Sequence, residues 1–125
     1  MIKQIPVSLG EFIDKITILQ IKKEKIKNPE QWLNVCHELD MLLALDDEKI
    51  VGTDLCNQLK MINTLLWYVE ENIRKREEEE DFGEEFIMTA RSVYKMNDKR
   101  AELKRRINLE YGSDLIEEKS YDDSQ

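Results

Sequence analysis

The chain has 125 residues, of which 37% are charged and 41% hydrophobic, with only 4 glycines and 2 prolines. This length indicates one domain, and this composition favours helices with charged outer faces over sheets. A net charge of −8 opposes nonspecific nucleic-acid binding. No apolar run is long enough to cross a bilayer, and the N-terminus lacks a signal-peptide pattern. We therefore expect a cytoplasmic protein.

The first two predicted helices carry clear N-terminal signals. Ser8 followed by Glu11 forms a capping box, so the first helix is expected to run to about Lys27. Asn28 precedes Pro29, which ends that helix, and Asn28 then caps a second helix with proline at its first position. The buried stripe predicted for the second helix is Trp32, Val35, Cys36, Leu39, Leu42 and Leu43.

The first predicted helix is apolar on two sides. One face carries Leu9, Phe12, Ile13, Ile16 and Leu19. Ile18 and Ile21 lie on the other side. A helix of this kind is either central in a bundle or covered by a partner. We therefore expect Ile18 and Ile21 to lie beneath another helix or in a contact between two copies of the chain.

Two long helices follow a connector at residues 46–53. The third has apolar residues at strict 4-3 spacing, which is typical of a coiled-coil seam: Leu55, Leu59, Ile62, Leu66, Val69 and Ile73. Asp81, with Glu84 as its box partner, is predicted to cap the fourth helix, and Gly112 to end it. Because the turn between these helices is short, they must form an antiparallel hairpin.

The predicted fold class is therefore all-α, a four-helix bundle built on a long antiparallel hairpin of helices three and four. We assign residues 1–112 to this helical bundle domain. Residues 113–125 form an acidic C-terminal tail that we expect to be partly ordered. Whether this tail docks on the bundle stays open at this point.

The buried face of the fourth helix changes from apolar to polar halfway along. Its apolar part is Phe86, Ala90, Val93 and Tyr94. The same face continues through Asn97, Ala101, Lys104 and Asn108. A buried polar group without a partner costs several kcal/mol, on the order of 2–7. These groups therefore either join a closed hydrogen-bond network or line an open cleft.

Hairpin geometry also brings polar side chains of the third helix near those of the fourth, with part of the first helix in reach. We predict that a polar groove between helices one, three and four binds a small anionic ligand. Its candidate residues are Asp14, Lys15, Asn63, Trp67, Glu70, Arg91, Tyr94, Asn97, Asp98, Arg100, Lys104 and Asn108. The alternative is an interhelical network that fixes register, with Glu70 paired to Arg91 and Arg74 to the acids that open helix four.

Patterns for catalysis or metal binding fail. His37 is the only histidine, and the sequence that follows it does not match H-E-x-x-H, so a zinc site lacks ligands. Glu11 and Asp14 fit the ExxD spacing of all-α nucleotide pyrophosphatases, but the only ExxE, residues 77–80, lies in an acidic turn. We expect no cofactor and no metal, and we expect Cys36 and Cys56 to be reduced core thiols.

Charge is separated along the chain. Residues 70–85 hold nine acids and three bases, a net −6, and residues 91–106 hold seven bases and two acids, a net +5. The basic segment could bind nucleic acid. We favour the simpler interpretation, in which acids open the last helix and bases close it, as the helix dipole prefers.

Several strings, in order, resemble one protein family. They are IPVSLGEFIDKITILQIK at residues 5–22, Leu66-Trp67, the pattern FIxxARxVYxxNDxRAxLK at residues 86–104, Ile107-Asn108, Gly112-Ser113 and EEKSY at residues 117–121. This is similar to a small family of bacterial and phage proteins without an assigned function, and it covers almost the full chain. The resemblance implies an all-helical fold and extends to seven candidate residues: Asp14, Lys15, Asn97, Asp98, Arg100, Lys104 and Asn108.

The sequence thus predicts a noncatalytic, cytoplasmic helical-bundle protein that acts through protein contacts as a homodimer. The alternative is a small-ligand-binding protein or enzyme that uses the polar groove for a phosphorylated or sugar-nucleotide compound. Nucleic-acid binding is disfavoured, and no membrane association is expected. The discriminating feature is whether Asn97, Lys104 and Asn108 are sealed or line an accessible pocket.

Overall fold

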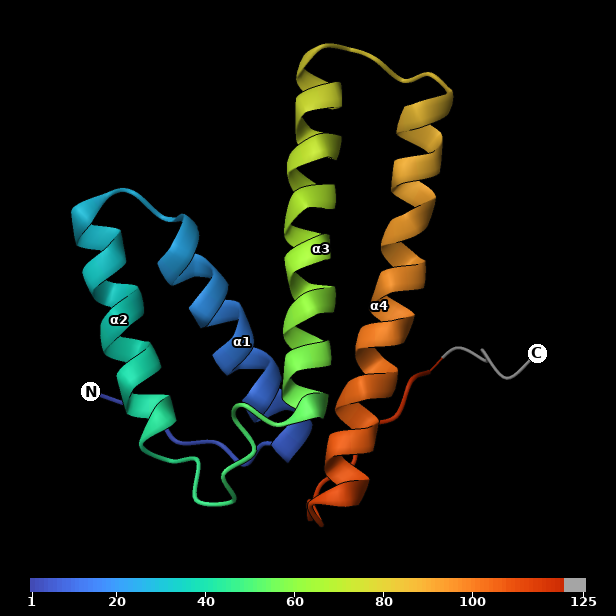
Figure 1. Cartoon of the computed structure of the whole chain (residues 1–125). Coiled ribbons are helices and arrows are strands. Elements are labelled where there is room, and N and C mark those ends of the chain that lie inside the picture. The colour runs from blue at the N-terminus through green and yellow to red at the C-terminus, as the bar shows by residue number, and fades with distance from the viewer. Residues whose placement is uncertain (121–125) are drawn as a thin grey trace.

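The computed structural model describes residues 1–120, and in that range the chain is all-α with no strand. Its helices are α1 (Leu9–Lys25), α2 (Pro29–Leu43), α3 (Asp54–Glu78) and α4 (Glu84–Glu110). They form a short hairpin of α1 and α2 and a long antiparallel hairpin of α3 and α4 (Figure 1). The predicted fold class, an all-α bundle built on the long hairpin, is confirmed.

Side-chain caps explain where the first three helices begin. The Ser8 hydroxyl accepts a hydrogen bond at 3.1 Å from the backbone N–H three residues on, at the start of α1. The Asn28 carboxamide does the same for α2 at 3.0 Å, with Pro29 at the first helical position. Thr53 caps α3 through its hydroxyl. Each cap satisfies an N–H that has no partner within the helix.

The start of α4 differs from the sequence prediction, because Gly83 and not Asp81 is its N-cap residue. The Asp81 carboxylate instead accepts hydrogen bonds from the Arg76 guanidinium at 2.9 Å and from the Gly83 N–H at 3.4 Å. Just before it, Glu80 has a positive φ of 55°. The ion pair with Arg76 and this left-handed residue keep Asp81 in the turn, so α4 begins three residues later.

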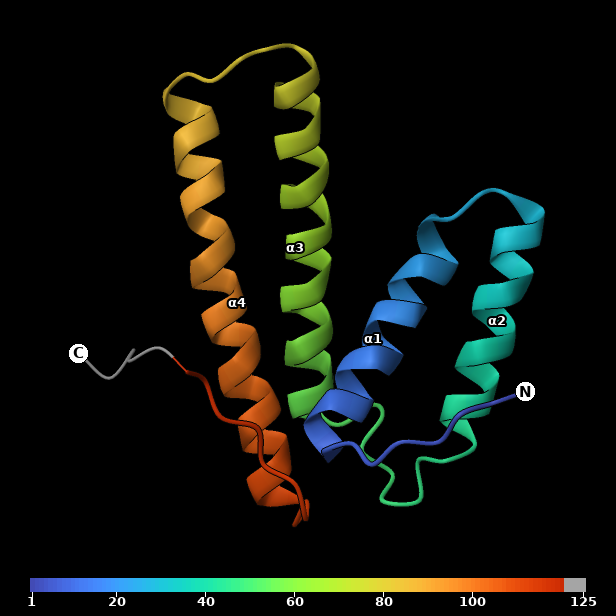
Figure 2. The same ribbon diagram turned by 180° about the vertical axis from the view of Figure 1, so that it is seen from behind.

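The end of α4 agrees with the prediction. Gly112 has a φ of 68°, and the Ser113 N–H donates to the Asn108 carbonyl at 2.8 Å. This is the bond that closes a glycine-terminated helix. Residues 113–120 then run back along α4 (Figure 2), and the Ser113 hydroxyl accepts from the Leu9 N–H at 3.0 Å. The predicted tail therefore docks in part, while residues 121–125 lie outside the described residues.

Helix α1 is central, since it packs against α2, α3 and α4, whereas α2 packs against α1 alone among the described helices. The core that α1 organises consists of Ile13, Ile16, Leu19, Val35, Leu39, Ile50, Leu55, Cys56, Leu59, Leu103 and Ile107. On the other side of α1, Ile21 is 1% exposed and Ile18 is half-buried. Elements of the same chain cover Ile21, so a two-sided apolar α1 needs no second copy.

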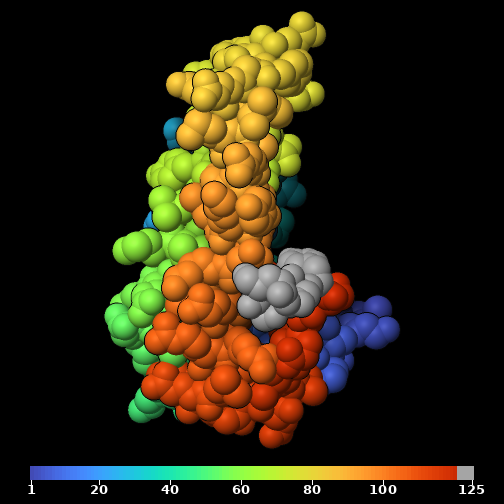
Figure 3. Space-filling view, turned by 90° about the vertical axis from the view of Figure 1, so that its right-hand side faces the viewer, coloured from blue at the N-terminus to red at the C-terminus, as the bar shows by residue number. Residues whose placement is uncertain are grey.

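The upper part of the long hairpin, residues 64–97, has no such cover, and we call it the distal half. No residue in this range is buried, whereas Asn63 just below it and Leu103 on α4 are. α1 and α2 lean away from α3 in both ribbon views (Figures 1 and 2). The space-filling view shows the tip of the hairpin projecting beyond the rest of the molecule (Figure 3). α3 and α4 therefore form most of this part of the molecule, and the end of α1 reaches it through Lys25, whose ammonium donates to the Tyr68 hydroxyl and lies 4.4 Å from the centre of its ring.

No helix within residues 1–120 combines the length and the hydropathy that crossing a membrane requires. Cys36 and Cys56 are both free thiols, the first half-buried and the second buried. The prediction of two core thiols holds for Cys56, whereas Cys36 lies outside the buried core.

Gly10 allows a close approach of α1 and α4, and its substitution tests that contact. A Cβ at this position would lie 2.4 Å from the Lys104 carbonyl oxygen, so α1 and α4 would have to separate. We expect Gly10→Ala to lower the free energy of unfolding in urea by about 1–3 kcal/mol, the usual cost of overpacking.

Gly83→Ala is the matched control for Gly10→Ala. A Cβ there would meet only the Asp81 side chain, at 3.5 Å, so we expect the loss to stay below about 1 kcal/mol, the typical effect of exchanging an N-cap residue. Equal losses for the two variants would contradict the close contact between α1 and α4.

Candidate functional site

A ladder of three polar contacts joins α1 to α4. Its pairs are Gly10 with Asn108, Glu11 with Lys104, and Asp14 with Arg100. The Gly10 N–H donates to the Asn108 amide oxygen at 2.6 Å, and the Lys104 ammonium donates to the Glu11 carboxylate at 2.6 Å. The Arg100 Nε donates to the Asp14 carboxylate at 2.8 Å. On α4 these partners are spaced four residues apart, so they lie on one face. The polar break in the sequence of α4 is thus the surface that receives α1.

Asp14 is the centre of this contact, with a side chain 1% exposed. Its carboxylate accepts two hydrogen bonds from the Arg100 guanidinium and one from the Asn63 amide at 2.9 Å. The same Asn63 nitrogen donates to the Thr17 hydroxyl at 2.9 Å, and that hydroxyl donates to the Asp14 carbonyl at 2.8 Å. The group joins α1, α3 and α4, and each polar atom has a partner, which is what a buried network requires.

The Arg100 guanidinium forms the boundary between this buried network and solvent. The hydrogen bond with Asp14 raises its pKa above the usual range against the opposing effect of burial, so it stays charged. Its side chain is 29% exposed, and its Nη1 reaches the Asn97 amide oxygen at 3.5 Å. Among the described residues no buried side-chain nitrogen or oxygen lacks a hydrogen-bond partner.

A cleft of about 590 Å³ opens directly beside this network, between α1, α3 and α4. We call it the α1–α3 cleft, and its lining residues are Ile18, Ile21, Asn63, Leu66, Trp67, Glu70, Glu71, Arg74 and Arg100. Two arginines and two glutamates balance in charge. The Trp67 indole donates to Glu71 at 2.5 Å, and Arg74 lies 3.6 Å from Glu70. A concave, partly apolar site with a few polar groups is the usual form of a small-molecule pocket.

The twelve predicted site residues separate into four groups. Four line the α1–α3 cleft: Asn63, Trp67, Glu70 and Arg100. Asp14 and Asn97 contact Arg100. Lys104 and Asn108 bind α1, and Asp98 binds Lys119. Lys15, Arg91 and Tyr94 lie elsewhere. Lys15 pairs at 3.0 Å with Glu38 of α2, and the other two are exposed on the distal half. The groove thus assembles in part around Arg100.

The alternative network proposed from the sequence has different pairs. Glu70 pairs with Arg74 on its own helix rather than with Arg91. Arg76, not Arg74, binds the acids near the start of α4, at 2.9 Å to Asp81 and at 2.6 Å to Glu85. The register of the long hairpin tip is fixed by Arg76, whose side chain is 20% exposed.

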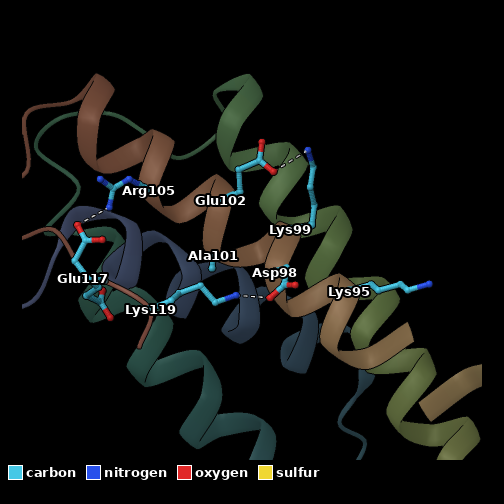
Figure 4. A pocket seen from close by; sticks show the side chains of 9 residues that line it. Lys95, Asp98, Lys99, Ala101, Glu102, Arg105, Glu117 and Lys119 are labelled. Atoms are coloured by element: carbon cyan, nitrogen blue, oxygen red, sulfur yellow. Dashed lines mark hydrogen bonds and ion pairs between the residues drawn. The ribbon is translucent and has the colours of Figure 1, made fainter. Parts of the chain in front are cut away.

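A second hollow, of about 600 Å³, lies between α4 and the C-terminal segment. Its charged lining residues are Lys95, Asp98, Lys99, Glu102, Arg105, Glu117, Glu118 and Lys119. Three ion pairs lie at this hollow (Figure 4). Arg105 lies 2.7 Å from Glu118 and Lys119 pairs with Asp98, which joins the C-terminal segment to α4, whereas Lys99 and Glu102 pair within α4 at 3.6 Å. Four positive and four negative side chains offset one another, so the hollow does not form a positive site for an anion.

Sequence reasoning missed two functional positions, Gly10 and Thr17. Glycine inside a helix is unfavourable unless a close approach requires it, so Gly10 in the first turn was a usable signal. Thr17 had no such signal, because its role depends on the position of Asn63 on another helix. Within residues 1–120, no group of three or more His, Cys, Asp or Glu side chains is arranged to hold a metal ion.

Comparison with known proteins identifies the family but no activity. Residues 3–124 match the model of a family of unknown function (DUF6165), so the chain belongs to that family. No curated protein and no solved structure matches the chain. The assignment of function therefore rests on the geometry described above.

Substitution of Asp14, compared with substitution of its neighbour Lys15, tests whether the buried network stabilises the fold. Asp14→Ala leaves Arg100 and Asn63 without their acceptor, and we expect the free energy of unfolding in urea to fall by about 3 kcal/mol, at the low end for a broken buried ion pair because Arg100 is partly hydrated. Lys15→Ala removes only an exposed pair with Glu38, and its loss should stay below about 1 kcal/mol. Similar small losses would show that the network is not structural.

Proposed function

We propose that this member of the DUF6165 family is a noncatalytic, cytoplasmic helical-bundle protein that acts through protein contacts and forms a homodimer. The observation that carries the proposal is the uncovered distal half of the long hairpin, residues 64–97. None of its residues is buried, although its sequence keeps the apolar spacing of a packed helix pair. Most helical stability in proteins comes from packing of an apolar face, so this half requires further cover.

The exposed apolar side chains of the distal half support the same proposal. Six large ones are more than two-fifths exposed: Leu65, Tyr68, Phe82, Ile87, Met88 and Tyr94. Large apolar side chains are also exposed elsewhere, such as Leu33 and Leu109. What supports an interaction surface here is that these six lie on one projecting element (Figure 3) in which no residue is buried. Tyrosine, phenylalanine and methionine are also the residue types enriched at interfaces. A second copy of the hairpin would supply two helices to complete a four-helix arrangement.

Free thiols are consistent with the proposed cytoplasmic location. Cys36 and Cys56 are unpaired, and disulfides are rare in reducing compartments. Burial raises the pKa of the Cys56 thiol, so this side chain stays protonated and acts as a small apolar core residue. Neither thiol sits in a metal-binding cluster of the described residues.

Sedimentation equilibrium of matched variants tests the homodimer. We expect the wild type to dimerise and Tyr94→Glu, on the distal half, to raise the dimer dissociation constant about 30-fold or more, as for a lost aromatic hot spot. Leu109→Glu is the control, since Leu109 is 59% and Tyr94 55% exposed on the same helix, but Leu109 lies outside the distal half. A monomeric wild type at tens of micromolar would overturn the proposal.

A second candidate function, small-ligand binding, is favoured by the α1–α3 cleft. The Trp67 indole and the Ile18 and Leu66 side chains offer an apolar wall, and Arg74 and Arg100 lie at its edge. Planar rings stack on indoles, and guanidinium groups bind phosphates in a bidentate manner. These features fit a phosphorylated or sugar-nucleotide compound, although Glu70 and Glu71 reduce the positive potential.

Thermal unfolding in the presence of nucleotides and sugar nucleotides tests this second function. Ligand at about 100 times its dissociation constant stabilises by about 2.7 kcal/mol, which raises the Tm by several degrees. We expect Trp67→Ala to lose this rise and Tyr68→Ala to keep it, because Tyr68 does not line the α1–α3 cleft. An unchanged wild-type Tm with every compound would remove the ligand-binding function.

A further inference from the structure

We infer that a second copy of this chain docks on the distal half with its long hairpin antiparallel to the first, so that the acidic tip of each hairpin lies beside Arg91 and Lys95 of the other. The inference rests on the proposed homodimer and adds the surface, the partner and the relative direction. It is carried by two independent observations, the uncovered continuation of the α1-binding face and the separation of charge along the hairpin.

The face of α4 that binds α1 continues toward the tip of the hairpin, where no other helix packs on it. Arg100, Lys104 and Asn108 receive α1 through the polar ladder, and Asp14 is the last α1 residue with a hydrogen bond to α4 because α1 then leans away (Figures 1 and 2). Toward the tip, the next residue on this face is Asn97, which contacts Arg100. Beyond it the face is apolar, with Val93, Ala90 and Phe86 at the same helical spacing. Among them Ala90 is exposed, and nothing in residues 1–120 covers it.

Another helix placed on this continued face would extend the packing that α1 begins. Three apolar side chains on this face are only half-buried: Phe86 and Val93 on α4 and Leu66 on α3. A docking helix would bury them further. The α1–α3 cleft opens onto the lower end of the same face. From the cleft to the end of α4, this face is occupied by α1 and the C-terminal segment. A docking hairpin therefore overlaps only the distal half, about 15 residues or about 22 Å of each helix at 1.5 Å per residue.

Charge selects the antiparallel direction. The tip segment 70–85 has a net charge of −6, whereas residues 86–97, the part of α4 inside the overlap, carry Arg91 and Lys95 and no acid, a net +2. Within residues 1–120, the carboxylates of Glu80 and Glu84 and the cationic groups of Arg91 and Lys95 form no ion pair inside the chain. Parallel hairpins would place two acidic tips together, whereas antiparallel hairpins bring acids near bases in two symmetric contacts.

Charge-reversal variants, measured by sedimentation equilibrium in low-salt buffer, test the direction. One variant carries Arg91→Glu with Lys95→Glu, and the other carries Glu80→Lys with Glu84→Lys. In antiparallel dimers each change places like charges together, so we expect each variant alone to dimerise about tenfold more weakly than the wild type. An equimolar mixture restores both opposite-charge contacts and should dimerise within about threefold of the wild type.

The control for these variants is Lys23→Glu with Lys27→Glu, which changes the net charge equally outside the distal half. Both lysines are exposed, and we expect the dimer of this control to be unchanged. A tighter dimer for the tip variant would indicate parallel hairpins and overturn the inference. A wild-type dimer that none of the variants affects would overturn the inference but leave the homodimer, whereas a monomeric wild type would overturn both. Far-UV circular dichroism confirms that the exposed substitutions leave the fold intact.

Discussion

The contact of α1 with α4 determines the shape of this molecule. Asp14 is fully buried, and its carboxylate accepts hydrogen bonds from Arg100 of α4 and Asn63 of α3. α1 therefore cannot slide or rotate without leaving a buried charge unpaired. One turn before Asp14, Gly10 allows the backbones of the two helices to touch. Both constraints act on the first two turns of α1. The remainder of the helix is therefore free to follow α2 away from the hairpin.

That divergence explains both candidate sites. Where α1 leaves α3, the space between them becomes the α1–α3 cleft, with Arg100 at its edge and Ile18 on its wall. Beyond the cleft, the end of α1 contacts α3 through Lys25 and Tyr68, and no residue of the distal half is buried. A sealed network and an open cleft were alternatives for the polar residues of α4, and the structure contains both. Asn108 belongs to the sealed contact, and Arg100 belongs to both. Lys104 is 18% exposed, its partner Glu11 is 42% exposed, and Lys104 borders a small hollow of about 200 Å³ beside the C-terminal segment.

The sequence predicted the helices well because their determinants are local. Ser8 and Asn28 cap through bonds three residues away, and Gly112 ends α4 through its own backbone angle. The polar break of α4 was also readable, since it follows from helical period. The tilt of α1 was not readable, because it depends on which side of α1 meets α4. For that reason Lys15 was assigned to the groove together with Asp14, although it points to Glu38 of α2.

In the proposed dimer, the distal half of each chain, which is exposed in the monomer, is covered by the other chain. Hydrogen–deuterium exchange followed at two protein concentrations, below and above the dimer dissociation constant, measures this directly. We expect amides near Ile13, Leu59 and Leu103 in the core to be strongly protected at both concentrations. Amides in residues 64–97 should exchange quickly in the dilute sample and more slowly in the concentrated one. Equal exchange of residues 64–97 at both concentrations would contradict the account.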